Sequence, residues 1–308
     1  MSRTAPDGPA AARTLLTNPH ADRVRAVRAL GTRSGRRRAG RYVVEGPQAV
    51  RELVRWAPGT VRDVYLTPDA ADRYAEIVTD AAAAGLHLHL GDEAVLAAMS
   101  ADAQGVLAVA DLPGATRPGA GAVPVGPLGA DALEAVLAAR PRLVAVLAQV
   151  RDPGNAGTVV RVADAAGADA VVVAGDSVET TNPKVVRSTA GSLYHLPVVS
   201  GVPVADAVDA LRAAGLLVLA ADGTGDLDLD DLQDAAAVAG ASGPAGDAAA
   251  DLRVPTAWLF GNEAWGLPPA DRDRADAVVR VPLRGRAESL NLGTAAAVCL
   301  YASSRAHR

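Results

Sequence analysis

Short apolar runs alternate with longer mixed stretches in the C-terminal half of the chain, a pattern typical of an α/β protein. The run 143–150 is almost entirely apolar and ends at a Pro-Gly turn, and 170–175 is a second such run. A short apolar run between turn residues predicts a buried strand, and 155–167 has the composition of a helix. Asn155 is placed to cap that helix. Strand, helix and strand together predict a parallel sheet, in which ligands bind at the carboxyl ends of the strands.

The same criteria divide the chain into two α/β regions. Between residues 15 and 111 we expect a helix carrying Val24, Val27 and Leu30, a basic loop over 31–40, helices over 47–56, 70–84 and 92–99, and strands over 42–45, 61–66, 86–90 and 105–110. From residue 131 to 308 we expect helices over 131–139, 182–192, 204–214 and 289–304, and strands over 197–199, 216–220, 256–261 and 277–283.

Three segments lack such patterns. Residues 1–14 are rich in Ala, Pro and Arg and are predicted to be a disordered tail. Residues 112–130 are rich in Pro, Gly and Ala and are predicted to be a linker. The stretch 222–255 is first acidic and then Ala/Gly-rich, and we expect a solvated loop with a low-complexity insertion.

Composition narrows the class of protein. The 308 residues are enough for two domains, and half of them are hydrophobic. The single cysteine, Cys299, excludes an intrachain disulfide, and we expect it to be a small core residue. No apolar segment approaches the ~20 residues that span a bilayer, and the N-terminus lacks a signal-peptide core, so we expect no membrane association and a cytoplasmic location.

Positive charge is concentrated near the N-terminus although the net charge is −5. The window 23–41 contains many arginines and no acidic residue. Such a window is either a solvated face or a local phosphate-binding patch. The candidate nucleic-acid contacts are Arg33, Arg36, Arg37, Arg38 and Arg41.

Polar residues gather at three strand-to-helix junctions. Asn155 and Arg161 follow the first strand, Gly261 to Leu267 follow the strand over 256–261, and Ser289 to Gly293 follow the strand over 277–283. In a parallel sheet these junctions lie at one edge, and we expect a ligand site there.

These motifs resemble those of the SpoU (TrmH) family of RNA ribose 2′-O-methyltransferases, in the SPOUT superfamily. The resemblance is carried by Asn155-x-Gly157-x-x-x-Arg161, by Phe260-Gly261-Asn262-Glu263-x-x-Gly266-Leu267, and by Val281-Pro282-Leu283 with Ser289-Leu290-Asn291-Leu292. It covers about 143–304, in the family's order. The first region, with Glu45-Gly46 and Gln104-Gly105, is similar to the ribosomal-protein-like α/β substrate-binding domain that precedes the catalytic domain in many rRNA-directed members.

The resemblance implies a trefoil-knotted parallel-sheet methyltransferase domain over 131–308, an RNA substrate-binding domain over 15–111, a homodimer, and S-adenosylmethionine as cofactor without a metal. It implies cofactor contacts, mostly through the backbone, at Leu259, Gly261, Gly266, Val281, Leu283 and Leu290. It implies catalytic roles for Asn155, Arg161, Glu263, Ser289 and Asn291. The reaction would be 2′-O-methylation of a ribose in RNA, with 23S rRNA as the expected substrate.

Arg161 is the family's candidate for action on the 2′-hydroxyl, and two versions stay open. A guanidinium stays protonated up to pH ~12, so Arg161 is a poor base unless a dry site deprotonates it. In the other version it stays charged, grips an RNA phosphate and stabilises the developing alkoxide. The plain structural alternative is an ion pair with Asp164, three residues along the same helix.

Other classes of function are less well supported. A tRNA methyltransferase and a non-catalytic RNA-binding or ribosome-assembly protein on the same fold stay open as alternatives. A nucleotide hydrolase or dehydrogenase is disfavoured, because neither a Walker lysine motif nor a Gly-x-Gly-x-x-Gly turn follows the first strand. His87, His89 and Asp92 could form a metal cluster, but an exposed strand face is the favoured interpretation.

Overall fold

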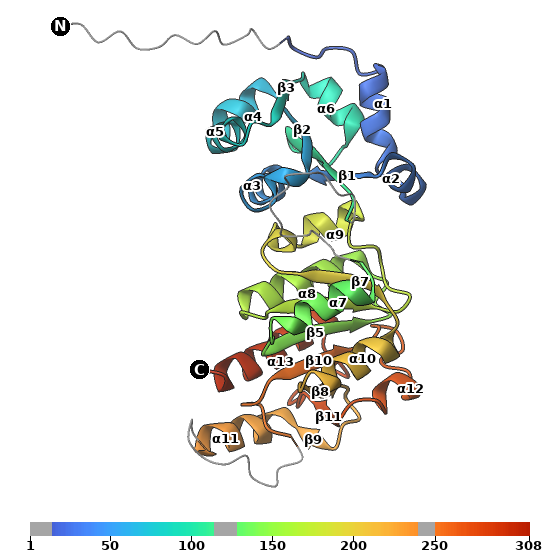
Figure 1. Cartoon of the computed structure of the whole chain (residues 1–308), viewed down its shortest axis with the longest axis vertical. Coiled ribbons are helices and arrows are strands. Elements are labelled where there is room, and N and C mark those ends of the chain that lie inside the picture. The colour runs from blue at the N-terminus through green and yellow to red at the C-terminus, as the bar shows by residue number, and fades with distance from the viewer. Residues whose placement is uncertain (1–13, 114–127, 240–249) are drawn as a thin grey trace, which may run out of the picture.

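The computed structural model describes residues 14–113, 128–239 and 250–308, and it contains two sheets that follow one another along the long axis of the molecule (Figure 1). The predicted tail, most of the predicted linker and the middle of the predicted insertion lie outside the described residues. The N-terminal sheet has four strands in the order β1-β4-β2-β3. Its strands are β1 (Arg41–Glu45), β2 (Val61–Leu66), β3 (His87–Leu90) and β4 (Val106–Asp111).

Helices cover both faces of this N-terminal sheet. They are α1 (Asp22–Ala29), α2 (Arg33–Ala39), α3 (Pro47–Trp56), α4 (Pro68–Arg73), α5 (Ala75–Ala83) and α6 (Glu93–Met99). Side chains alternate across β1, so Val43 packs with α1 and α6 while Tyr42 and Val44 pack with α3 and α5. Asp92 caps α6 with its carboxylate, and Thr67 caps α4 with its hydroxyl.

The C-terminal sheet has seven strands, all parallel, in the order β7-β6-β5-β10-β8-β11-β9. The strands are β5 (Leu143–Ala148), β6 (Ala170–Ala174), β7 (Val198–Val202), β8 (Leu217–Ala221), β9 (Leu227–Asp228), β10 (Thr256–Phe260) and β11 (Ala277–Arg280). The central strands β5, β6 and β10 are buried along their whole length, as expected for a parallel sheet covered on both faces. The predicted parallel α/β fold is confirmed; the trefoil knot stays a prediction.

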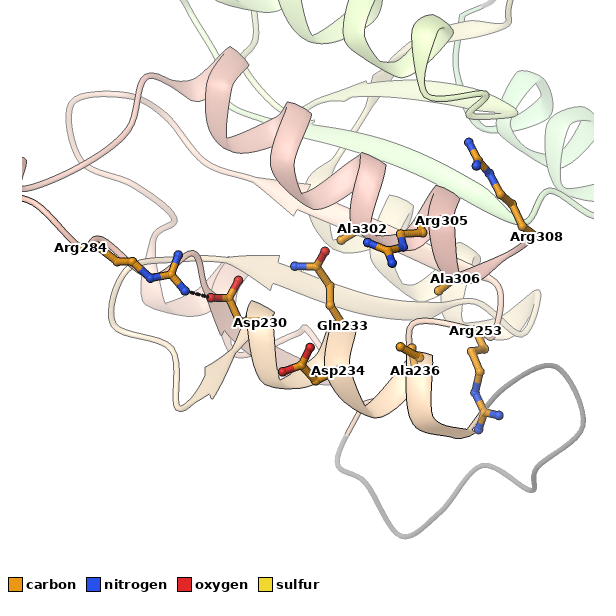
Figure 2. Close-up of a pocket in the computed structure, with 11 residues that line it drawn as sticks. Asp230, Gln233, Asp234, Ala236, Arg253, Arg284, Ala302, Arg305, Ala306 and Arg308 are labelled. Atoms are coloured by element: carbon orange, nitrogen blue, oxygen red, sulfur yellow. Dashed lines mark hydrogen bonds and ion pairs between the residues drawn. The ribbon is translucent and has the colours of Figure 1, made fainter.

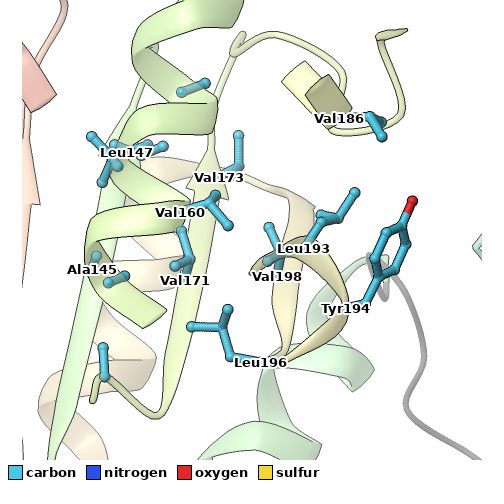
Figure 3. Close-up of a cluster of buried hydrophobic side chains, with 14 of the residues drawn as sticks. Ala145, Leu147, Val160, Val171, Val173, Val186, Leu193, Tyr194, Leu196 and Val198 are labelled. Atoms are coloured by element: carbon cyan, nitrogen blue, oxygen red, sulfur yellow. The ribbon is translucent and has the colours of Figure 1, made fainter. Parts of the chain in front are cut away.

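The helices of this half sort onto two faces of the sheet. They are α7 (Ala130–Ala138), α8 (Pro153–Ala165), α9 (Pro183–Ser188), α10 (Val204–Ala213), α11 (Leu229–Ala239), α12 (Pro269–Arg272) and α13 (Leu292–Ala306). Residues of α8 and α13 pack on one face, and residues of α7 and α10 on the other. Figure 3 shows Val160 of α8 directed at Val171 and Val173 of β6, with Leu193 and Tyr194 alongside.

Two buried groups tie α13 to the sheet. The indole nitrogen of Trp258 in β10 donates to the hydroxyl of Ser303 at 2.9 Å, and neither residue is exposed. Cys299 is also fully buried, which confirms it as a core residue, and its burial raises the pKa of the thiol. The helix that closes the chain is therefore an integral part of the core.

Several predicted element boundaries are wrong. The expected basic loop is helix α2, which Thr32 caps by accepting from Gly35 N, and arginine is itself a good helix former. The expected single helix over 70–84 breaks at Tyr74 into α4 and α5. The acidic stretch is ordered as β9 and α11, because Leu229 and Leu232 are buried against the core.

The predicted starts of α8 and α13, at two of the junctions that form the candidate site, are also wrong. Helix α8 begins at Pro153, and its cap is Asp152, which accepts from Asn155 N at 2.8 Å. Asn155 therefore lies inside the first turn, and its side chain is free for other contacts. Helix α13 begins at Leu292, with Asn291 as its cap.

Candidate active site

The candidate site lies at the carboxyl ends of β5 and β10, where the three predicted junctions meet. Asn155 donates through Nδ2 to Glu263 Oε1 at 2.7 Å. Asn291 donates through Nδ2 to Asn155 Oδ1 at 2.9 Å, and its own Oδ1 accepts from Gly293 N at 2.9 Å. The structure thus joins these candidate residues from separate motifs into one hydrogen-bonded chain, Glu263–Asn155–Asn291, which we call the Glu–Asn–Asn chain. Glu263 and Asn291 are exposed and Asn155 is partly exposed, so the chain is accessible to a ligand.

Two small residues let the helices behind this chain approach closely. A Cβ at Gly157 of α8 would lie 2.4 Å from Ser188 Cβ of α9. A Cβ at Gly293 of α13 would lie 2.5 Å from Thr158 Cγ2 of α8. Helix α8 therefore packs closely against both α9 and α13, and this packing fixes the position of Asn155.

Arg161 lies further along α8 and is not part of the Glu–Asn–Asn chain. It is six residues beyond Asn155, about 9 Å along the helix axis at 1.5 Å per residue. Its side chain is exposed and, within the described parts of the chain, makes no hydrogen bond or ion pair. The alternative ion pair with Asp164 is not formed, since that carboxylate contacts His195 instead. Ser289 is also exposed, in the irregular segment between β11 and α13, and likewise has no hydrogen-bond partner among the described residues.

The loop after β10 is held by a residue that the sequence interpretation did not select. Asn262 is 6% exposed and donates through Nδ2 to Gln149 O at 3.0 Å, while its Oδ1 accepts from Ala264 N at 2.9 Å. Its backbone exchanges two hydrogen bonds with Gly266, of 3.0 and 2.8 Å. The only signal in the sequence is its position inside the second motif, between Gly261 and Glu263.

Glycines close this loop tightly. A Cβ at Gly261 would lie 2.4 Å from the carbonyl carbon of Gly266. Gly266 itself has φ +68, a conformation that side chains disfavour. The loop therefore presents bare backbone at the end of β10, which is the kind of surface that the predicted backbone contacts to a cofactor require.

A cavity of about 430 Å³ lies between the segment after β11 and helix α13. Its lining includes the predicted cofactor residues Val281, Leu283 and Leu290, together with Val298 of α13. The volume is within the range of small-molecule sites, and the lining is mostly apolar, which suits an adenosyl group. Leu259 is fully buried within β10, so any contact that it makes to a ligand is through its backbone. The residues present thus fit S-adenosylmethionine.

A second cavity, of about 480 Å³, adjoins the first (Figure 2). Arg284 and Asp230 line both cavities and form an ion pair with each other. In Figure 2 this ion pair lies at one end of the second cavity, and Arg305 and Arg308 of the C-terminal segment lie at the other. Four arginines and two aspartates line it, so its lining carries an excess of positive charge.

The candidate RNA-binding arginines divide into two groups. Arg37 and Arg38 of α2 are exposed, and Arg33 keeps 67% of its side chain exposed. Arg41 is 45% exposed and lies 3.9 Å from Asp111. Arg36 is 2% exposed and forms an ion pair with Glu179 of the C-terminal half. Its assignment as an RNA contact is therefore wrong, because the chain uses this guanidinium internally.

The suggested metal cluster is not formed. His89 contacts Asp63 at 2.8 Å and stacks on Tyr65, and it is only partly exposed. Over the described residues, no group of three or more His, Cys, Asp or Glu side chains could hold a metal ion. Among the helices of those same residues, none has the length and apolarity needed to cross a bilayer.

The chain resembles known families and proteins along most of its length. The SpoU rRNA Methylase family model matches residues 142–301, and the model for RNA 2′-O ribose methyltransferase substrate binding matches residues 43–114. The 23S rRNA (uridine(2479)-2′-O)-methyltransferase of Streptomyces viridochromogenes is 31% identical, over 96% of this chain and 93% of its own. The 23S rRNA (guanosine(2553)-2′-O)-methyltransferase RlmP of Bacillus subtilis is 30% identical, over 88% of this chain and 92% of its own.

A solved structure shows the same arrangement. The SpoU methyltransferase AviRb from Streptomyces viridochromogenes, in complex with the cofactor AdoMet, has a TM-score of 0.70 at 29% identity, covering 92% of this chain and 98% of that one. The family match over residues 142–301 contains all three junctions of the candidate site. The chain is a member of the SpoU rRNA methylase family.

Proposed function

We propose that this protein transfers a methyl group from S-adenosylmethionine to the 2′-oxygen of a ribose in 23S rRNA. The observation that carries the proposal is the Glu–Asn–Asn chain, which unites three separate sequence motifs. Its Asn291 directly follows Leu290, which lines an apolar cavity of suitable size. Family membership supplies the reaction class, and the names of the relatives supply the substrate.

The cofactor and the catalytic side chains are assigned to neighbouring elements. Val281, Leu283 and Leu290 would hold S-adenosylmethionine, together with the backbone at Leu259, Gly261 and Gly266. When bound, it supplies a methyl group on a sulfonium sulfur. Proximity to the ribose can contribute several kcal/mol, so the protein's task is chiefly to orient the 2′-hydroxyl and assist the loss of its proton.

Each catalytic candidate has a proposed role that follows from its contacts. Glu263 orients Asn155, and Asn155 orients Asn291, so these amides present fixed hydrogen-bonding groups to the ribose. Ser289, with its free hydroxyl, would donate to the cofactor or the ribose. Arg161 is exposed, and an exposed guanidinium stays charged, which supports the version in which it grips an RNA phosphate and stabilises the alkoxide.

The N-terminal half would deliver the RNA. Exposed Arg33, Arg37, Arg38 and Arg41 form a basic surface on an otherwise acidic chain, and such a surface attracts phosphates. We place the limits of this substrate-binding domain at 15–111 and of the methyltransferase domain at 131–308. A cytoplasmic location follows from a ribosomal substrate.

We also infer that two copies of the chain associate. Val298 and Tyr301 of α13 are large side chains with 38% and 50% exposure, three residues apart on one helix face. The hydroxyl of Tyr301 donates to Ala165 O at 3.2 Å, which extends this face onto α8. Sedimentation should show a dimer, and Tyr301→Glu should produce a monomer. A wild-type chain that sediments as a monomer at micromolar concentration would remove this inference.

Methyl transfer from labelled S-adenosylmethionine to unmodified 23S rRNA tests the proposed function, with purified tRNA as the comparison. Label in an alkali-resistant linkage of 23S rRNA is the expected result, because a 2′-O-methyl group blocks cleavage at that ribose. Label in tRNA alone would change the substrate class. No label in either pool, with calorimetry still showing cofactor binding, would support a non-catalytic RNA-binding protein.

A further inference from the structure

One part of the junction between the two halves is a set of hydrogen bonds and ion pairs around His195. His195 belongs to the turn after α9, and its two ring nitrogens face carboxylates from different halves of the molecule. Nδ1 lies 2.8 Å from Asp164 Oδ2 of α8, and Nε2 lies 3.3 Å from Glu52 Oε2 of α3. The ring of Trp56 approaches the imidazole edge-on at 5.5 Å. His195 thus connects the helix that carries Arg161 to the N-terminal half.

The side chain of Glu52 is held rigidly at this point. Arg51 Nε and Trp56 Nε1 both donate to it at 3.2 Å. A Cβ at Gly191 would lie 2.4 Å from Glu52 Cγ, so the turn before His195 fits closely over this carboxylate. Burial acts to raise the pKa of Glu52, but the hydrogen bonds from Arg51 and His195 outweigh it and lower the pKa, which keeps the side chain ionised.

Asp164 is the acidic residue nearest in sequence to Arg161, and the two are spaced i and i+3 on α8. Side chains at this spacing lie on neighbouring positions of the helix surface and readily form ion pairs. The pair is nevertheless absent here, since Asp164 contacts His195 and Arg161 has no partner in the described structure. A partnered guanidinium would have to exchange its carboxylate for an RNA phosphate before it could act.

We propose that His195 is a positioning residue, which holds Asp164 away from Arg161 and so leaves the Arg161 guanidinium available to RNA. Glu52 anchors the imidazole from the other side, so docking of the N-terminal half prepares the catalytic helix. The inference rests on the proposed function, because it assigns a purpose to the unpaired state of Arg161.

Two variants and a matched control test this proposal. In His195→Ala, Asp164 is released and pairs with Arg161, and kcat for RNA methylation should fall about twofold, the effect of one strong helix ion pair. In His195→Ala with Asp164→Ala, no acid is left to capture Arg161, and kcat should return to near the wild-type value. His87→Ala removes an exposed histidine of β3 that has no partner in the described structure, and it should match the wild type.

The outcomes separate positioning from a merely structural role. A double variant that stays as slow as His195→Ala overturns the proposal, because loss of packing or docking cannot be repaired by a second deletion. A raised KM for RNA with unchanged kcat in both His195→Ala and the double variant also overturns it, and assigns His195 to domain docking alone. A wild-type chain that fails to methylate any RNA defeats the proposed function itself, which is a distinct result.

Discussion

At the scale of single residues, the loop after β10 depends on the absence of one side chain. Gly261→Ala would place a methyl group 2.4 Å from the carbonyl carbon of Gly266, and such overpacking costs about 1–3 kcal/mol. The loop must shift, so we expect the affinity for S-adenosylmethionine to fall about tenfold or more, measured by calorimetry. Gly223→Ala is the control, because nothing lies within 4 Å of its Cβ position. Equal affinities in the two variants would exclude this loop from the cofactor site.

Within the described structure Arg161 has no partner, so its replacement removes no structural contact there. Arg161→Ala should reduce kcat for methyl transfer by about a hundredfold or more, since removal of one group that stabilises developing charge costs this much in other enzymes. The melting temperature and cofactor affinity should stay unchanged, because the side chain is exposed and unpaired among the described residues. Turnover at the wild-type rate would remove Arg161 from the mechanism.

From the sequence, the residues that meet at the site could be predicted better than the role of each residue. The order of the motifs and the parallel sheet were enough to bring Asn155, Glu263 and Asn291 together. We predicted Asn155 as the cap of α8, whereas the cap is Asp152. Both residue types cap helices, and only the backbone geometry distinguishes them. Asn262 was missed because its contacts are to backbone groups, which leave no pattern in the sequence.

At the scale of elements, α13 is attached to the sheet through a buried polar contact. Ser303→Ala removes the acceptor for the indole N–H of Trp258 and leaves that group buried without a partner. An unsatisfied buried donor costs about 1–3 kcal/mol, and we expect the free energy of unfolding by urea to fall by this amount. Ser304→Ala, one residue further on and partly exposed, should change it little. A similar loss in both variants would contradict the assigned role of this hydrogen bond.

The end of the same helix should make stability depend on pH. Burial lowers the pKa of His307, and the charge of Arg142 lowers it further, although Nε2 donates to Val254 O at 2.9 Å. The unfolded chain therefore binds this proton more readily than the folded one. The stability that neutral His307 contributes is complete above the ordinary histidine pKa of about 6.5, and it is lost as the pH falls through the lowered pKa of the folded protein.

Thermal unfolding at several pH values measures this effect. Between pH 7.5 and pH 5, the melting temperature of the wild type should fall more than that of His307→Gln, which has no proton to gain. Identical decreases in both proteins would show that the end of α13 does not take part in the pH dependence.

Element boundaries were predicted least well in highly charged segments that fold as helices. The arginines of α2 and the aspartates around α11 gave both segments the composition of loops. Each segment folds because a few positions contact the rest of the protein, Arg36 in the first case and Leu229 and Leu232 in the second. Such long-range contacts depend on the assembled fold, so local patterns do not reveal them.

At the scale of the whole molecule, the buried and exposed arginines of α2 should behave differently. Replacement of Arg33, Arg37 and Arg38 by Ala should weaken RNA binding and reduce the slope of log K against log salt by about 1 for each lost phosphate contact. Arg36→Ala should instead lower the stability of the folded protein, because it removes the buried guanidinium that pairs with Glu179. An unchanged salt slope in the triple variant would show that these arginines form a solvated face and make no phosphate contacts.

The junction between the halves joins them more closely than the composition of the predicted linker suggested. Arg36 pairs with Glu179, Arg187 with Glu45 at 2.7 Å, and His195 faces Glu52. Tyr42 and Tyr194 belong to one hydrophobic cluster that continues across the junction. None of these pairs is detectable from sequence spacing, because their members are more than a hundred residues apart.

The full burial of Cys299 has a practical consequence for studying this junction. The only thiol of the chain is inaccessible and, with its pKa raised, stays protonated, so thiol-reactive dyes should leave the native protein unlabelled. A pair of cysteines introduced on α2 and α13 would then be the sole sites of attachment. Energy transfer between two dyes could follow the distance between the halves during RNA binding, without first removing a native residue from the core.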